Sequence, residues 1–122
     1  MTTYTVPQLA TDALLRFGAI DERESASAQE QARVQTLYDL KIAELEIDDR
    51  VYWTSSAIPA LVFGALSRII AEELAPALGM PIPTETDDTS GQQVSIGTRG
   101  RRMLARALAR PPSGQRTMAE YF

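Results

Sequence analysis

Apolar side chains recur at helical spacing in four stretches of the chain. Thr5 precedes the first stretch and Ser27 the second, each followed three residues later by Gln8 or Glu30, the spacing of a capping box. The pattern predicts a first helix ending at Gly18 and a second from residue 28 to about 47. The third stretch begins after Ile58-Pro59 and is the most apolar, so it should form the centre of the core.

Two segments between these helices are harder to assign. Residues 51–54 favour β structure and predict a short strand or an extended link, with Trp53 covering the helical core. Pro76 should kink or end the third helix, because proline lacks the backbone donor and clashes with the preceding turn. Residues 81–96 predict a long polar loop, and such a loop inside a small domain is usually functional or ordered by a partner.

The fourth helix, expected over residues 98–110, carries most of the positive charge. Residues 1–98 hold 15 acidic and six basic side chains (−9), whereas residues 99–122 hold six arginines and Glu120 (+5). At about 100° per residue four arginines share one stripe, opposite Leu104 and Leu108. Gly100 should weaken this helix, so we expect it to be weakly docked and to need an anionic partner. The stripe consists of Arg99, Arg102, Arg106 and Arg110.

The sequence therefore predicts an all-α single domain: a small bundle of three to four helices with a long polar loop and an extended C-terminal arm. Residues 1–97 form the helical core with the loop, and residues 98–122 form the Arg-rich helix and a docking tail. Tyr121 and Phe122 are an unusual pair in a polar segment, and they are either incidental or an anchor that inserts into another subunit.

The acidic residues at the end of the second helix have the wrong sign for a helix C-terminus. They are either a solvated end or a patch that meets arginines of a neighbouring copy. These residues are Glu44, Glu46, Asp48 and Asp49.

Composition excludes several classes of function. The chain has neither cysteine nor histidine, which excludes disulfides, the usual zinc sites and the Ser-His-Asp triad. Asp87 and Asp88 are expected to be solvated loop residues, not cation ligands. We expect no enzyme, no metal and no cofactor. The longest apolar run has about half the roughly 20 residues that a spanning helix needs, and no basic leader is visible, so we expect a soluble protein that is made in a cytoplasm.

Two functions remain for the Arg-rich segment, apart from an incidental excess of arginine. It could bind DNA phosphates without sequence preference, as in a small DNA-binding packaging or regulatory protein. It could also dock on an acidic protein surface, since guanidinium groups pair well with carboxylates. The strongly acidic remainder of the chain favours the protein partner.

The order of features resembles the head-to-tail connector (adaptor) proteins of tailed bacteriophages. The resemblance runs from Leu15-Arg16-Phe17-Gly18-Ala19-Ile20, through the aromatic link at Val51-Tyr52-Trp53 and the helix to Ala77-Leu78-Gly79, to the Arg-rich helix and Tyr121-Phe122. It spans nearly the whole chain but rests on a diffuse pattern and contains no catalytic signature.

The resemblance implies a ring, typically a dodecamer, that binds below the portal protein and receives a stopper or tail-completion protein. The protein would then be found in the head-tail neck of the virion, and in the host cytoplasm during assembly. Packaged DNA would pass through the channel without sequence-specific binding. The implied portal-binding residues are Arg99, Arg102, Arg106, Arg110, Tyr121 and Phe122.

The acidic residues after the second helix would lie between subunits, and residues 84–93 could reach the next subunit or the tail-side partner. The last helix is richer in arginine than the family pattern demands. Whether some of its arginines face the portal or the DNA in the channel is left open.

Overall fold

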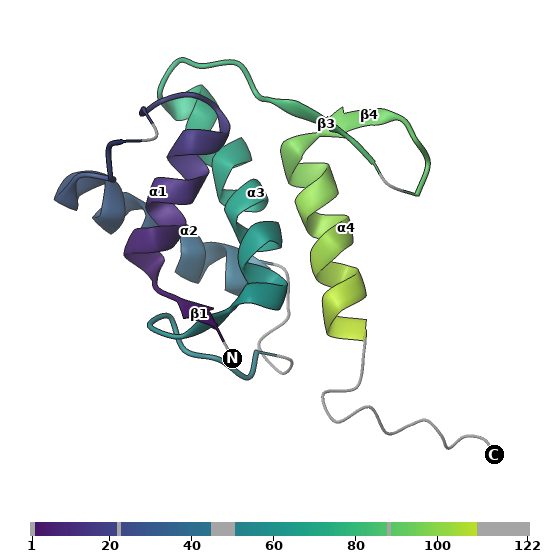
Figure 1. Cartoon of the computed structure of the whole chain (residues 1–122), viewed down its shortest axis with the longest axis horizontal. Helices are drawn as coiled ribbons and strands as arrows, with labels where there is room; N and C mark the ends of the chain where they lie inside the picture. Colours follow the sequence, from purple (N-terminus) through teal and green to yellow (C-terminus); the bar gives the residue numbers. More distant parts are fainter. Residues whose placement is uncertain (1, 22, 45–50, 88, 110–122) are drawn as a thin grey trace.

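The computed structural model describes residues 2–21, 23–44, 51–87 and 89–109, and these form a small all-α bundle (Figure 1). Its helices are α1 (Val6–Arg16), α2 (Ala28–Glu44), α3 (Ala60–Ala77) and α4 (Ile96–Ala109). Two short antiparallel pairs join β1 (Thr3–Tyr4) to β2 (Ile58–Pro59) and β3 (Thr84–Thr86) to β4 (Gln93–Ser95). The predicted fold class is confirmed. None of the described helices combines the length and apolar character needed to cross a membrane.

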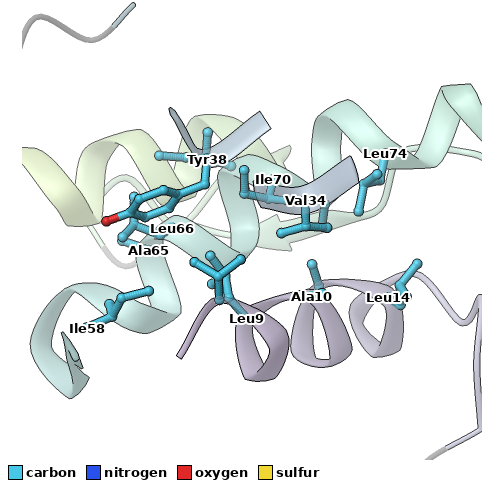
Figure 2. Close-up of a cluster of buried hydrophobic side chains, with 14 of the residues drawn as sticks. Leu9, Ala10, Leu14, Val34, Tyr38, Ile58, Ala65, Leu66, Ile70 and Leu74 are labelled. Carbon is cyan, nitrogen blue, oxygen red and sulfur yellow. The ribbon is translucent and has the colours of Figure 1, made fainter. Parts of the chain in front are cut away.

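Helix α3 is the centre of the bundle: α1 lies on one side of it and α4 on the other, and α2 crosses behind α1 and α3 in the view of Figure 1. Figure 2 shows Leu9 and Leu14 of α1 pointing toward Val34 of α2 and Ile70 of α3, all fully buried. Nine of the 18 residues of α3 are buried, as its apolar pattern predicted.

Both predicted capping boxes are present. The Thr5 amide donates to Gln8 Oε1 at 2.8 Å, and the Gln8 amide donates to Thr5 Oγ1 at 3.4 Å. Ser27 and Glu30 exchange the same two bonds at 2.8 and 3.2 Å. These bonds satisfy amides that have no partner inside the helix, which is why α1 and α2 begin where they do.

The aromatic link at residues 51–54 is irregular, with a bend at Trp53, and is not a strand. Trp53 is buried on the core, and its Nε1 donates to the Tyr38 hydroxyl at 2.7 Å. The strand that follows this link is β2, immediately before α3. It pairs antiparallel with β1, with Thr3 opposite Pro59. Pro76 is tolerated in the last turn of α3, which ends one residue later.

The prediction of an unstructured loop over residues 81–96 is wrong, because this segment contains the β3–β4 hairpin. Its turn is closed by the Asp87 amide donating to the Gln92 carbonyl and the Gly91 amide donating to the Asp87 carbonyl, both at 2.8 Å. Gly91 has a φ of +72°, a conformation that glycine adopts without strain. Strands of three mostly polar residues carry no hydrophobic alternation, so the pattern could not reveal them.

The expectation of a weakly docked last helix is also wrong. Helix α4 packs on α3 with Ile96, Gly97, Gly100 and Leu104 buried. A Cβ at Gly100 would lie 2.7 Å from the Ala65 carbonyl oxygen and 2.9 Å from the Arg68 Cβ. The missing side chain therefore lets the two helices approach closely. The cost of glycine in the helix is offset by this contact.

Replacing Gly100 with alanine should lower the free energy of unfolding by about 1–3 kcal/mol, because the new methyl group collides with backbone of α3. The control is Gly64→Ala in α3, where a Cβ would meet one side-chain atom, Arg68 Nη1 at 3.2 Å, and no backbone atom of another element. There the better helix propensity of alanine should leave stability unchanged or raise it by up to about 1 kcal/mol. Urea unfolding measures both, and a stabilised Gly100→Ala would contradict the close approach.

Candidate functional site

The arginines of α4 lie along the β3–β4 hairpin of the same chain. Arg99 Nη1 is 3.0 Å from Glu85 Oε1, Arg102 Nη1 is 3.0 Å from Asp87 Oδ2, and Arg106 Nη1 donates to Thr89 Oγ1 at 3.5 Å. Alternate hairpin residues thus meet arginines three and four positions apart on the helix. We call these six side chains the arginine ladder.

Glu85 joins three elements at the top of this ladder. Its Oε1 accepts from Arg68 Nε of α3 at 2.7 Å and from Arg99 of α4 at 3.0 Å, and all three side chains are at most 24% exposed. Partial burial alone would raise the pKa of Glu85, but the hydrogen bonds and charges of the two arginines outweigh it and lower the pKa. The carboxylate therefore stays ionised and fixes the hairpin against both helices.

Asp87 forms the second rung and is only 1% exposed. Its Oδ2 accepts from the Ser90 hydroxyl at 2.9 Å and the Ser90 amide at 3.1 Å, as well as from Arg102. The Ser90 bonds, with the Arg102 charge, lower the pKa of Asp87 against the effect of burial. Its Oδ1 has no hydrogen-bond donor among the described residues. The expectation of a solvated loop acid is wrong for Asp87, and Asp88 lies outside the described residues.

Glu72 of α3 also holds the N-terminal end of α4, through residues that the sequence pattern did not single out. Its Oε1 accepts from the Gly97 amide at 3.0 Å in the first turn of α4, and its Oε2 lies 3.3 Å from Arg101 Nη2. Burial would raise the pKa of Glu72, but hydrogen bonds from Ser95 and Gly97 and the Arg101 charge lower it. A carboxylate at a helix N-terminus is also favoured by the helix dipole.

The predicted portal-binding residues differ in how accessible they are. The Arg99 side chain is 20% exposed and Arg102 is 51% exposed, while Arg106 is exposed. Arg110, Tyr121 and Phe122 lie outside the described residues. On the described part of α4, a docking surface would thus consist mainly of Arg101, Arg102 and Arg106.

Of the four predicted inter-subunit acids, Glu44 alone is described; Glu46, Asp48 and Asp49 lie outside the described residues. Glu44 is exposed and lies 3.0 Å from Lys41 Nζ, which also pairs with Glu73 of α3. Burial would lower the pKa of Lys41, but hydrogen bonds to Glu73 and Glu44 raise it. Helices α2 and α4 lie on different sides of α3, so Glu44 and the arginine ladder are not neighbours within one chain (Figure 1).

An open groove of about 480 Å³ forms a second candidate site, which the sequence analysis missed. It lies along α1 and has both apolar and polar lining residues. The apolar or aromatic ones are Tyr4, Pro7, Leu15 and Phe63, and the polar ones are Gln8, Thr11, Asp12, Ser25 and Gln31. The Tyr4 and Phe63 rings stack with centroids 4.3 Å apart. Its residues come from separate segments, so no sequence motif marks it.

Chemically, the contacts of α4 with the hairpin and α3 hold charged side chains at fixed positions. The described residues contain no group of three or more acidic, histidine or cysteine side chains that could hold a metal ion. Comparison with protein-family models, curated proteins and solved structures finds no match. The resemblance to phage connectors therefore stays a prediction.

The Glu85→Gln variant tests the arginine ladder through its pH dependence. At neutral pH we expect its free energy of unfolding to be about 1–3 kcal/mol lower than that of wild type, because two partly buried arginines lose their counter-charge. Since the pKa of Glu85 is lowered in the fold, the advantage of wild type is present above about pH 4.5 and is lost as pH falls through the folded-state pKa. Urea unfolding from pH 7 to 3 measures this, and a pH-independent difference would contradict it.

Proposed function

We propose that this protein is a structural head-to-tail adaptor of a tailed phage. It forms a ring under the portal, extends the DNA channel and connects to the stopper or tail proteins. The observation that carries the proposal is the fixed, arginine-rich surface of α4, which holds four arginines and no acidic residue and lies at the edge of the bundle (Figure 1). The order of the sequence features supports the same role.

The arginine ladder suits α4 for docking on a large acidic surface. Each of the four arginines of α4 contacts a polar or acidic residue of its own chain, so little side-chain freedom is lost on binding. Arg102 keeps half of its side chain exposed while one nitrogen contacts Asp87. The guanidinium groups are therefore held in place but can still meet carboxylates of a portal ring.

A closed ring needs two different surfaces on each subunit, one for each neighbour. In this bundle α2 and α4 lie on different sides of α3 and differ in charge, since α4 is purely basic whereas α2 carries three acidic and two basic residues. The acidic residues that begin with Glu44 would then meet arginines of the next copy. This division is suited to head-to-tail assembly.

A small DNA-binding packaging or regulatory protein, which would use the arginine stripe on phosphates without sequence preference, is the weaker alternative. Glu85 and Asp87 compete with any anionic partner of the arginine stripe, but residues 1–98, with 15 acidic and six basic side chains, add repulsion along a DNA duplex. DNA that passes through the channel of a ring without sequence-specific binding does not need its phosphates to contact these arginines. The DNA-binding function would need duplex affinity that falls steeply with salt.

The proposal predicts that the double variant Arg106→Glu/Arg110→Glu loses portal binding. Two reversed charges in one interface should weaken the complex at least about tenfold. The matched control is Arg33→Glu on the exposed face of α2, away from α4. Co-sedimentation with purified portal rings measures binding, and electron microscopy should show an added ring below the portal with the wild-type protein.

Circular dichroism must show that the variants keep their helices. Wild-type protein that neither co-sediments with portal rings nor adds a ring to them would overturn the adaptor function. Loss of binding in the control as well would mean that the loss in the double variant does not identify α4 as the docking surface.

A further inference from the structure

The β3–β4 hairpin is attached to the bundle by polar contacts. None of its described side chains, in residues 84–87 and 89–95, belongs to the hydrophobic core. At its base the Ile96 amide donates to the Pro83 carbonyl at 2.9 Å, where the hairpin joins α4. Beyond the base it is joined to the helices by the arginine ladder and by the ion pair of Glu85 with Arg68. Charged and polar contacts therefore decide whether its tip stays on α4.

The arginine ladder becomes more exposed from the base of the hairpin to its tip. The two arginines that hold Glu85 near the base have side chains that are 14% and 20% exposed. Arg102 on the next rung is 51% exposed, and Arg106, which reaches Thr89 at 3.5 Å, is exposed. Ion pairs that face water contribute little unless several charges form a network, as they do around Glu85. The contacts at the tip should therefore break before those of Glu85.

Asp87 carries the charge that holds the tip, and its burial has a cost. Its Oδ2 lies 3.0 Å from Arg102 Nη1, while its Oδ1 is buried and has no hydrogen-bond donor among the described residues. A buried carboxylate oxygen without a donor costs free energy, which contact with water would recover. The ion pair with Arg102 therefore favours the closed tip, and the unpaired oxygen favours its release.

We propose that the tip of the hairpin is a latch that an acidic protein partner opens. The latch consists of the contacts of Asp87 with Arg102 and of Thr89 with Arg106, and Glu85 holds the base in place as the hinge. Carboxylates of the partner replace Asp87 on Arg102, and the tip then moves away from α4. The inference goes beyond the proposed function, because it applies to any acidic polypeptide and does not need the partner to be a portal.

The chemistry of this exchange fits carboxylates. A guanidinium group pairs in the same way with the carboxylate of Asp87 and with a glutamate or aspartate of a partner, so no arginine loses its counter-charge when the latch opens. The exposed half of Arg102 lets the partner bind before Asp87 leaves. Because the hairpin holds Asp87 close to Arg102 at a high effective concentration, only a partner that supplies several carboxylates together displaces it.

Spin labels can measure the opening, because the chain has no cysteine of its own. Gln92→Cys places a nitroxide at the exposed tip of the hairpin, and Ala105→Cys places another on an exposed position of α4. The matched control pairs Ala105→Cys with Thr84→Cys, which is exposed at the base of the hairpin. Pulsed electron paramagnetic resonance gives the distance between the two labels, without and with polyglutamate as the acidic polypeptide.

We expect polyglutamate to lengthen the distance from the tip by at least about 5 Å, since Gln92 lies about 10 Å beyond Ser95 at the base. The distance from Thr84 should change by less than about 2 Å, because a residue at the hinge barely moves. Bound polyglutamate that leaves the tip distance unchanged would overturn the proposal, as would equal lengthening from the base. A wild-type protein that does not bind polyglutamate at low salt would overturn it as well.

Asp87→Asn tests the latch without labels. Asparagine keeps an oxygen that accepts from Ser90 but lacks the charge that pairs with Arg102, so the tip should open more easily. We expect polyglutamate to bind this variant at least about fivefold more tightly than wild type. The matched control, Asp39→Asn at an exposed position of α2, removes the same charge and should gain less than about twofold, because salt screens distant charges.

Equal gains in the two variants would indicate a general effect of net charge and would overturn the latch. Circular dichroism must show that both variants keep their helices, and the spin-label measurement on the chain with Asp87 intact stands without them. Portal co-sedimentation separates this inference from the adaptor function. A tip that opens with polyglutamate in a protein that portal rings do not bind leaves the latch and overturns the adaptor function. A tip that stays closed in a protein that binds portal rings overturns the latch alone.

Discussion

The close approach of α4 to α3 at Gly100 is the constraint on which the rest of this structure depends. With no side chain at this position, the helix lies directly against the Ala65 carbonyl and the base of the Arg68 side chain. That distance brings the arginines of α4 within reach of Glu85, and Glu72 within reach of the first turn of α4. The hairpin, in turn, is held where α3 and α4 meet. A wider helix spacing would separate the groups that pair across it.

The parts of the fold that the sequence predicted are those governed by local signals. The Thr5 and Ser27 capping boxes, the apolar period of α3 and the buried Trp53 each depend on residues a few positions apart, so a single sequence reveals them. The hairpin has no such signal, because Thr84–Thr86 and Gln93–Ser95 are mostly polar and its stability comes from contacts with α3 and α4. Gly100 shows the same limit. Helix propensity gives the cost of a glycine within α4, but it carries no information about the backbone of α3 that lies beside it.

The candidate site was predicted in part. The spacing of Arg99, Arg102 and Arg106 correctly placed them on one stripe, but sequence could not show that Glu85 and Asp87 of the same chain lie against it. An arginine stripe alone therefore does not distinguish a surface waiting for a partner from one that already has internal partners. The groove was invisible for a related reason, since Tyr4, Leu15 and Phe63 become neighbours only after α1 packs on α3.

The pairing of the β3–β4 hairpin with α4 also limits where the chain can accept inserted residues. The seven steps from Arg99 to Arg106 advance about 10 Å along the helix, whereas the hairpin leaves the strand after Thr86 and is already in its turn at Thr89, so the two elements match over only a few positions. One residue inserted in β3 would turn Glu85 away from the guanidinium groups and bring its neighbour toward them. Related chains should therefore differ in length at the tip between Ser90 and Gln92, where an insertion leaves the register of both elements intact.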